Sequence, residues 1–198
     1  MPSSLISTNA IQVHLISDGK GFDWFSVVTL LIAIGGFVFG LYQYWIGKRW
    51  KRIEYIDAVV KRMREEALLK AAYLFLDWEE RDIKVGNRIV KYRCAMLKTA
   101  LRNHYAMKPN EGFTEDEAAI RDAFDAFFDF CSSLQYAVEL KMITHADIFA
   151  SPVGYYLGKA CEKNTATDKT LSEYAKVYGF DRTSKLLVAY QHTAVKTA

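Results

Sequence analysis

An uncharged stretch of 23 residues, 24–46, divides this chain of 198 residues into a part suited to a lipid bilayer and a part suited to water. At a rise of about 1.5 Å per residue, a helix of this length crosses a hydrocarbon core of roughly 30 Å. Aromatic side chains stand at both ends, as at the two interfaces of membrane helices. They are Trp24, Phe25, Tyr42, Tyr44 and Trp45. We therefore predict one transmembrane helix.

Basic residues are concentrated on one side of this predicted span. The four that follow it directly are Lys48, Arg49, Lys51 and Arg52. Residues 1–23 carry a single base, Lys20. The positive-inside rule then predicts an extracytoplasmic tail at 1–23 and a cytoplasmic domain at 47–198. The four bases are predicted to contact lipid headgroups, because juxtamembrane bases are attracted to anionic leaflets.

A cleaved signal peptide is the alternative interpretation of residues 24–46. In a signal peptide, bases precede a shorter apolar run, and small residues mark the cleavage site. Here the apolar run begins far from Met1, is longer and is followed by the bases. We therefore expect an anchor that is retained.

Small and polar residues form a stripe along the span at alternating spacings of three and four. The stripe consists of Ser26, Thr29, Ala33, Gly36, Gly40, Gln43 and Gly47. Helices that pack together in membranes use small residues at their interface. Three interpretations stay open: a chance pattern of residues common in membrane helices, a homodimer or small bundle, and a larger ring. In a ring, Ser26, Thr29 and Gln43 would line the lumen.

The cytoplasmic domain is predicted to be an all-α bundle of five to six helices, without strands. Apolar residues keep a helical period from Ile53 to Leu74, so the membrane helix is expected to run directly into the domain. The first stop signal is Gly86-Asn87, and a further helix is expected at 88–107.

Later helix starts are marked by capping residues. Thr114 with Glu117 forms a capping box, and Thr144 with Asp147 repeats the pattern. Pro152 suits a first helical turn. The core is expected to contain large apolar side chains from several helices. These are Leu74, Leu97, Phe124, Phe127, Phe128 and Leu134.

Neither the cysteines nor the histidines indicate a metal site or a cofactor, and we expect none. Cys94, Cys131 and Cys161 are far apart and form no C-x-x-C pair, as is typical of reduced, buried thiols. None of the four histidines belongs to an H-x-x-x-H or H-E-x-x-H pair. The net charge of +3 comes mostly from the bases after the span, so it favours anionic lipid over nucleic acid as a partner.

Arg102, His104 and Asp77 are the weak candidates for catalysis. Arg102-Asn103-His104 is similar to the arginine–histidine motif of HEPN ribonucleases, but its spacing is shorter. Residues two apart on a helix point to nearly opposite sides, so the pair shares one phosphate only where the helix has ended. Asp77 is expected to pair with Arg81 one turn later, or to accept from a buried donor.

Two segments carry a resemblance to known proteins. They are 50–83, with WKRIEYIDAVV and LLKAAYLFLDWEERDI, and 113–149, FTEDEAAIRDAFDAFFDFCSSLQYAVELKMITHADIF. They resemble a group of uncharacterised bacterial proteins with one amino-terminal membrane helix, an L-x-L-D-W segment and a helix rich in aspartate and phenylalanine. The architecture is also similar to the membrane-pore accessory protein of type VI-B CRISPR systems, which assembles into a ring and has a divergent HEPN-like cytoplasmic part.

The resemblance implies a single-pass protein of the bacterial inner (plasma) membrane. The leading hypothesis is a non-enzymatic, membrane-anchored and oligomeric effector or scaffold that affects membrane integrity in anti-phage defence. One alternative is a membrane-tethered HEPN-like ribonuclease. Another is a passive module that recruits a cytosolic protein partner to the membrane.

Overall fold

The computed structural model describes residues 24–108, 111–162 and 166–197, and most of these residues are helical. They belong to two units that divide between Trp45 and Ile46. The predicted extracytoplasmic tail lies outside the described residues.

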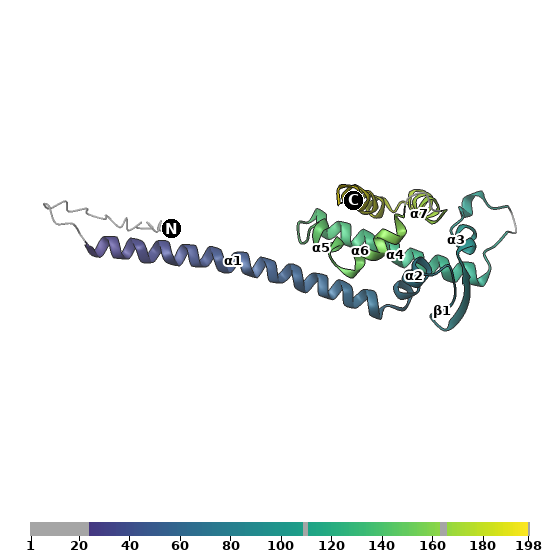
Figure 1. Ribbon diagram of the computed structural model, residues 1–198, viewed down its shortest axis with the longest axis horizontal. Coiled ribbons are helices and arrows are strands. Elements are labelled where there is room, and N and C mark those ends of the chain that lie inside the picture. The colour runs from purple at the N-terminus through teal and green to yellow at the C-terminus, as the bar shows by residue number, and fades with distance from the viewer. Residues whose placement is uncertain (1–23, 109–110, 163–165, 198) are drawn as a thin grey trace, which may run out of the picture. The chain divides into compact units, whose positions relative to one another are not determined.

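Helix α1, Trp24–Glu65, is a single helix of 42 residues (Figure 1). The predicted continuation of the apolar helix into the basic segment is therefore confirmed. Among the described residues, α1 is the one helix that is long and apolar enough to cross a membrane, and none of its apolar window is buried within the protein.

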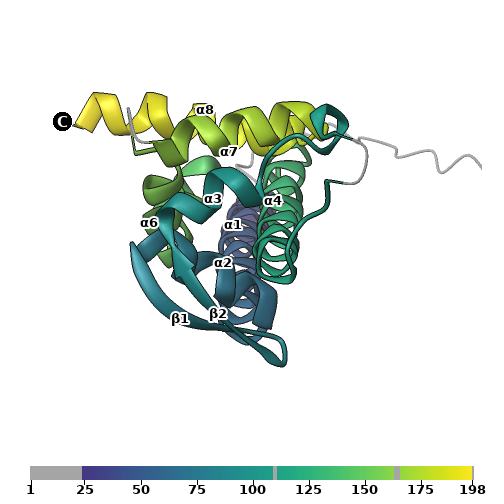
Figure 2. The ribbon, with the colours of Figure 1, turned by 90° about the vertical axis from the view of Figure 1, so that its right-hand side faces the viewer.

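The second unit, from Ile46 onward, is organised around one long helix, α4, Glu115–Glu139. The elements before it are α2 (Ala67–Asp77), β1 (Glu80–Val85), β2 (Arg88–Arg93), α3 (Cys94–Ala100) and the 3₁₀ turn η1 (His104–Ala106). The elements after it are α5 (His145–Phe149), α6 (Pro152–Ala160), α7 (Ala166–Val177) and α8 (Asp181–Thr197). Helices α2, α3 and α8 pack on α4, while α7 and α8 lie on the opposite side of the unit from the hairpin β1–β2 (Figure 2).

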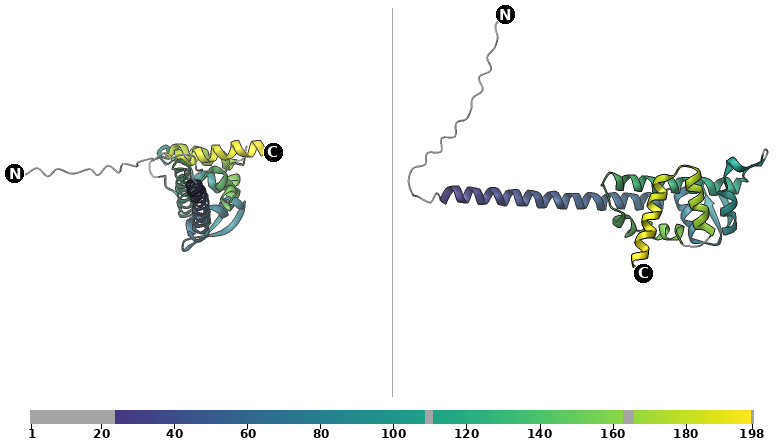
Figure 3. Two further views of the ribbon diagram at one scale, coloured as in Figure 1. Left: turned by 90° about the vertical axis from the view of Figure 1, so that its left-hand side faces the viewer. Right: turned by 90° about the horizontal axis from the view of Figure 1, so that it is seen from above.

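The end of α1 runs beside α4 (Figure 3), and the Arg62 guanidinium lies 5.8 Å from the Phe130 ring centroid. The predicted unbroken helix toward Gly86 is wrong at two points. The chain leaves helical geometry at Glu66, where ψ is 116°, and again after Asp77. The first break lets α2 pack on α4, where Tyr73 makes an edge contact with Phe127 at 5.9 Å between centroids.

A β-hairpin, β1–β2, forms in a part of the chain that we predicted to be helical. Among the described residues, these two strands are the departure from the all-α prediction. Strands β1 and β2 pair antiparallel, with Ile83 opposite Val90. Apolar residues alternate with exposed polar ones, so that Ile83, Val85, Val90 and Tyr92 are all buried. Gly86, at φ 58°, takes the positive-φ position of a two-residue hairpin turn.

The hairpin also shortens the helix that was expected at 88–107. Only Cys94–Ala100 is α-helical, and a 3₁₀ turn follows at His104–Ala106. Ile89, which a helix would have buried with its neighbours, is 67% exposed. The strand period therefore overrides the helical one in this segment.

The predicted core and helix starts are otherwise confirmed. Phe124, Phe127 and Phe128 are fully buried, and both predicted capping boxes form, at Thr114 and Thr144. Three further residues named from the sequence also belong to the core: Leu97 and Leu134 are buried, and Leu74 is partly buried against the core cluster. Pro152 begins α6, as expected of proline in a first turn.

Candidate functional site

The predicted Arg102–His104 pair lies at a corner of the chain rather than on a helix. Helix α3 ends at Ala100, and the Asn103 side chain caps the following turn by accepting a hydrogen bond from the Tyr105 amide at 2.9 Å. The objection that residues two apart face opposite sides of a helix therefore does not apply here. Whether this corner has a catalytic or a structural role depends on which groups bind the Arg102 and His104 side chains.

The Arg102 guanidinium is engaged by the loop that leads into α4. It donates to the Glu117 carboxylate at 2.8 Å and to the carbonyl oxygens of Thr99 and Gly112 at 2.6 and 2.9 Å. It also lies 4.6 Å from the centroid of the Phe113 ring. These contacts hold the loop between α3 and α4 against the start of α4, and the Arg102 Nε is buried without a hydrogen-bond partner.

Glu117 has two roles in this arrangement: it closes the capping box with Thr114, and it accepts from Arg102. Burial raises its pKa, but the hydrogen bonds from Arg102 and from the Thr114 amide outweigh this effect, so the pKa lies below the ordinary value of 4.5. Because the folded-state pKa is lowered, ionised Glu117 stabilises the fold above the unfolded-state pKa. This stabilisation is lost as the pH falls through the folded-state value.

We expect Glu117→Gln to lower the free energy of unfolding by about 1–2 kcal/mol at neutral pH, because hydrogen bonds to a charged group are lost. The difference from the parent should shrink as the pH falls below the unfolded-state pKa and through the lowered folded-state pKa, because the parent carboxylate then becomes protonated as well. Thermal unfolding of the full chain in mild detergent, repeated across this pH range, measures it. Asp122→Asn, on the exposed face of α4, is the control, and a pH-independent difference for Glu117→Gln would contradict the assignment.

His104 is held by Tyr178, which follows α7. The Tyr178 hydroxyl lies 2.6 Å from His104 Nδ1 and accepts from the His104 backbone amide at 2.9 Å. The two rings stack with centroids 5.4 Å apart, and Tyr105 covers His104 at 3.8 Å. The imidazole is thus built into an aromatic cluster, and its contacts differ from those of Arg102.

Arg121, on α4, is the centre of this aromatic cluster and was not singled out from the sequence. Its guanidinium lies 4.5 to 4.9 Å from the ring centroids of Phe113, Tyr174 and Tyr178. Its Nη1 donates to a backbone carbonyl of the corner, that of Arg102, at 3.3 Å. Arg121 therefore joins α4, α7 and the loop after α3.

Asp125 lies on α4, one turn after Arg121. It is half-buried and accepts a hydrogen bond from the Tyr174 hydroxyl at 2.6 Å. Burial raises the pKa of Asp125 despite this hydrogen bond, and burial together with the Asp125 contact raises the pKa of Tyr174. The spacing of Tyr174 and Tyr178, one helical turn apart, was the available signal for this cluster.

A pocket of about 250 Å³ lies between α3 and α7 beside this corner. Its lining includes Lys98, Arg102, Glu173 and Tyr178, but His104 is not part of it. A ribonuclease at this corner would need the histidine to face the bound phosphate. The geometry therefore favours a structural role for the corner.

Asp77 ends α2 and accepts a hydrogen bond from the Tyr155 hydroxyl of α6 at 2.5 Å. This contact raises the pKa of Tyr155. The expected ion pair with Arg81 is wrong, because the helix has ended and Arg81 lies on β1, 4.6 Å from the centroid of the Trp78 ring. Asp77 thus fastens α2 to α6, and the Tyr155 donor is exposed rather than buried.

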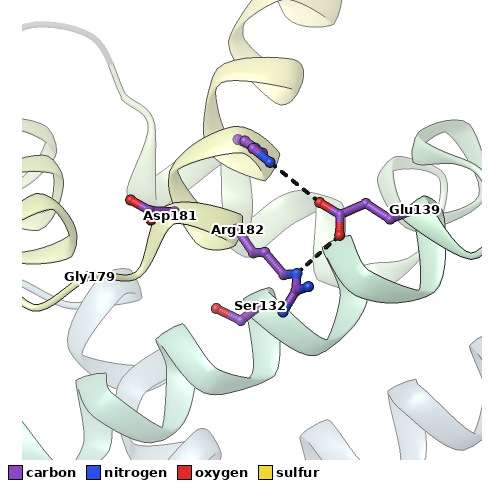
Figure 4. Close-up of a pocket in the computed structure, with 6 residues that line it drawn as sticks. Ser132, Glu139, Gly179, Asp181 and Arg182 are labelled. Atoms are coloured by element: carbon purple, nitrogen blue, oxygen red, sulfur yellow. Dashed lines mark hydrogen bonds and ion pairs between the residues drawn. The ribbon is translucent and has the colours of Figure 1, made fainter.

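A second pocket, of about 330 Å³, lies between α4 and α8 (Figure 4). Glu139 accepts from Arg182 at 3.0 Å and lies 3.6 Å from the Lys185 ammonium nitrogen, and the Arg182 contact holds the pKa of Glu139 below its usual range. Arg182 also lies over the Tyr136 ring at 4.7 Å. Each of these three charged groups has a protein partner, so the cluster acts as a brace between two helices.

The membrane-related candidates lie along α1. All seven residues of the stripe from Ser26 to Gly47 are solvent-accessible within the chain, and Thr29 donates to the Phe25 carbonyl of its own helix at 2.9 Å. Among the four predicted headgroup-binding bases, Lys48, Arg49 and Lys51 are exposed. Arg52 is partly buried, and its Nη1 lies 3.7 Å from the Asp147 carboxylate.

No family model, curated protein or solved structure matches this chain. Within the described residues there is no group of three or more histidine, cysteine, aspartate or glutamate side chains that could hold a metal ion. Inference of the function therefore depends on the geometry of the described residues, and its main feature is the exposed apolar surface of α1.

Proposed function

We propose that this protein is a single-pass membrane protein that self-associates through α1 and holds its second unit at the membrane surface as a non-enzymatic scaffold. The observation that carries this proposal is the exposure of large apolar side chains along the first half of α1. Phe25 is 81% exposed, Ile32 70%, Phe37 68% and Trp45 77%. A contiguous apolar surface of this size marks a membrane or an interaction surface.

A bilayer accounts for this surface better than a protein core does. A helix that is apolar all round is either buried or spans a membrane, and no part of the apolar window is buried within the chain. The basic residues that follow favour a cytoplasmic location for the second unit.

The stripe supports self-association of the anchor. A Cβ atom built on Gly36 or Gly40 meets nothing within 4 Å, so this face of the helix is open to a neighbour. Small residues allow two helix backbones to approach closely in a membrane, where apolar contact with lipid provides no preference for association. The size of the assembly decides between a compact scaffold and a ring that affects membrane integrity in anti-phage defence.

A non-enzymatic role is supported by the partners of the candidate catalytic side chains. Arg102 is bound by Glu117, His104 by Tyr178 and Asp77 by Tyr155. A catalytic group must reach a proton or a phosphate on the substrate, and these three groups are held by other parts of the fold.

The proposed topology predicts opposite labelling of two cysteines in intact spheroplasts. Cys94 is exposed on the second unit, whereas Cys131 and Cys161 are buried. A membrane-impermeant maleimide should label Ser3→Cys, introduced into a Cys94→Ser background, from outside. It should label the natural Cys94 only after the membrane is permeabilised.

Two outcomes would overturn the proposed topology. One is labelling of Cys94 in intact spheroplasts. The other is release of the protein from membranes by alkaline carbonate, which strips peripheral proteins but leaves spanning helices in place. Loss of residues 1–46 from the mature protein would instead establish the signal-peptide interpretation.

A further inference from the structure

The second unit contains a pocket of about 290 Å³ between the part of α1 that follows the apolar span and the corner that joins α5 to α6. This volume is close to the lower end of the range of roughly 300–1,000 Å³ that is typical of small-ligand sites. Two arginines, two aspartates and two isoleucines contribute to its lining: Arg49, Arg52, Ile53, Ile56, Asp57 and Asp147. The pocket thus combines both signs of charge with an apolar surface.

Arg52 has an unused donor in this pocket. Its Nε is buried and has no hydrogen-bond partner. The separation of 3.7 Å between Arg52 Nη1 and Asp147 is that of an ion pair and is too long for a hydrogen bond. A buried N–H group without an acceptor is rare in folded proteins, so this atom remains a donor for an acceptor oxygen in the pocket.

The charges of the pocket are ordered along α1. Arg49 and Arg52 lie three and six residues beyond Ile46, which corresponds to about 4.5 and 9 Å along a helix. Asp57 lies a further five residues from the span. The headgroup region of a bilayer extends roughly 5–7 Å beyond the hydrocarbon core. If α1 is anchored as proposed, Arg49 falls within this region, and Arg52 lies one turn beyond Arg49, from where its long side chain can extend toward it. The positive groups therefore lie nearer the bilayer than Asp57 does.

We propose that this pocket binds the headgroup of a phospholipid that carries a phosphate and a terminal primary ammonium, as in phosphoethanolamine lipids. The proposal rests on the anchoring of α1 in a membrane. Guanidinium groups of Arg49 and Arg52 bind the phosphate through paired hydrogen bonds, and the orphaned Nε of Arg52 gains an acceptor. The ammonium, which lies farther from the glycerol backbone than the phosphate does, donates to Asp57 and Asp147.

The two carboxylates distinguish this ligand from other phosphate compounds. A headgroup with negative charge alone would bring no counter-charge to Asp57, whereas Asp147 already has Arg52 at 3.7 Å. A quaternary ammonium has no N–H to donate to them, whereas a primary ammonium has three donors. The isoleucines offer an apolar surface to the glycerol end of the headgroup.

The test is lipid retention by the full-length protein, purified in mild detergent after exposure to an equimolar mixture of phosphatidylethanolamine, phosphatidylcholine and phosphatidylglycerol. Native mass spectrometry counts the lipids that remain bound to each chain. We expect phosphatidylethanolamine to be retained about tenfold more than either other lipid, which is the effect of one hydrogen bond to a charged group. Soluble phosphoethanolamine is added separately and should not displace the lipid.

Charge-matched variants separate the pocket from general attraction to the membrane. Arg49→Lys with Arg52→Lys keeps the charge but loses the planar donors, and it should reduce this retention about tenfold. Lys48→Gln with Lys51→Gln removes two charges from the same segment, but neither lysine lines the pocket, so retention should be unchanged. Asp57→Asn, at an exposed position, should abolish the preference over phosphatidylglycerol while leaving phosphate binding.

Equal retention of the three lipids, or an unchanged preference in the double-lysine variant, would overturn the proposal. Preference for phosphatidylglycerol would show an anion site, and displacement by soluble phosphoethanolamine would show a site for a small molecule; both contradict a phosphoethanolamine lipid site. A protein that spans the membrane in the cysteine-labelling experiment but shows no lipid preference would refute the pocket alone. A protein released by carbonate would refute the anchoring on which it rests.

Discussion

The chain with Gly36→Leu and Gly40→Leu is expected to be monomeric in mild detergent, whereas the parent chain is expected to form a homo-oligomer. The chain itself has room for both leucines, since a Cβ atom at either position meets nothing within 4 Å. Both changes increase hydrophobicity and helix propensity, so membrane insertion is retained. A loss of assembly would therefore report the removal of a close helix–helix contact.

Particle mass by light scattering, corrected for detergent, measures this effect against a chain mass of 22.6 kDa. Gly35→Leu is the matched control, because Gly35 also has open space around it but lies about 100° around the helix from Gly36. The control should assemble like the parent. If the double variant does so too, the stripe is not the interface and both oligomer interpretations lose their support.

The second large effect is expected in the core, where Phe128→Ala should lower the free energy of unfolding by about 3–5 kcal/mol. Phe128 is fully buried on α4, and its ring stacks with Tyr174 and Phe180 at 5.6 and 5.1 Å between centroids. Its removal leaves a cavity where α4, α7 and the start of α8 meet. A loss of this size is a large part of the stability of a typical domain.

Thermal or urea unfolding of the full chain, followed by tryptophan fluorescence, measures the change. Val188→Ala, at a position 50% exposed on α8, is the control and should cost about 0.5 kcal/mol or less. A loss for Phe128→Ala as small as that of the control would contradict the packing around α4.

Features defined by short-range patterns were predictable from the sequence. The capping boxes at Thr114 and Thr144 involve residues three apart, and the buried face of α4 follows from phenylalanines at helical spacing. The length and apolar character of α1 are likewise local properties. Backbone hydrogen bonds in a helix join residues four apart, so such patterns determine it without reference to the rest of the fold.

The hairpin shows where a local pattern is ambiguous. Ile89, Tyr92 and Met96 fit a helical spacing, whereas Ile83 and Val85 alternate as in a strand. The Gly86-Asn87 pair was interpreted as the end of a helix, but a two-residue turn between alternating segments is also a hairpin signal. Burial of Val90 and Tyr92 against the rest of the unit decides between the two.

By itself, the sequence determined an apolar helix, its basic flank, the start of each capped helix and the phenylalanine core, because these depend on neighbours within a few residues. Only the tertiary structure decided which partners the polar groups find. Tyr178 lies 74 residues from His104, and Tyr155 lies 78 residues from Asp77. The same holds for Arg52 and Asp147, whose pairing creates the pocket next to the predicted span. Charged side chains have many chemically equivalent partners, and packing of the whole chain selects among them.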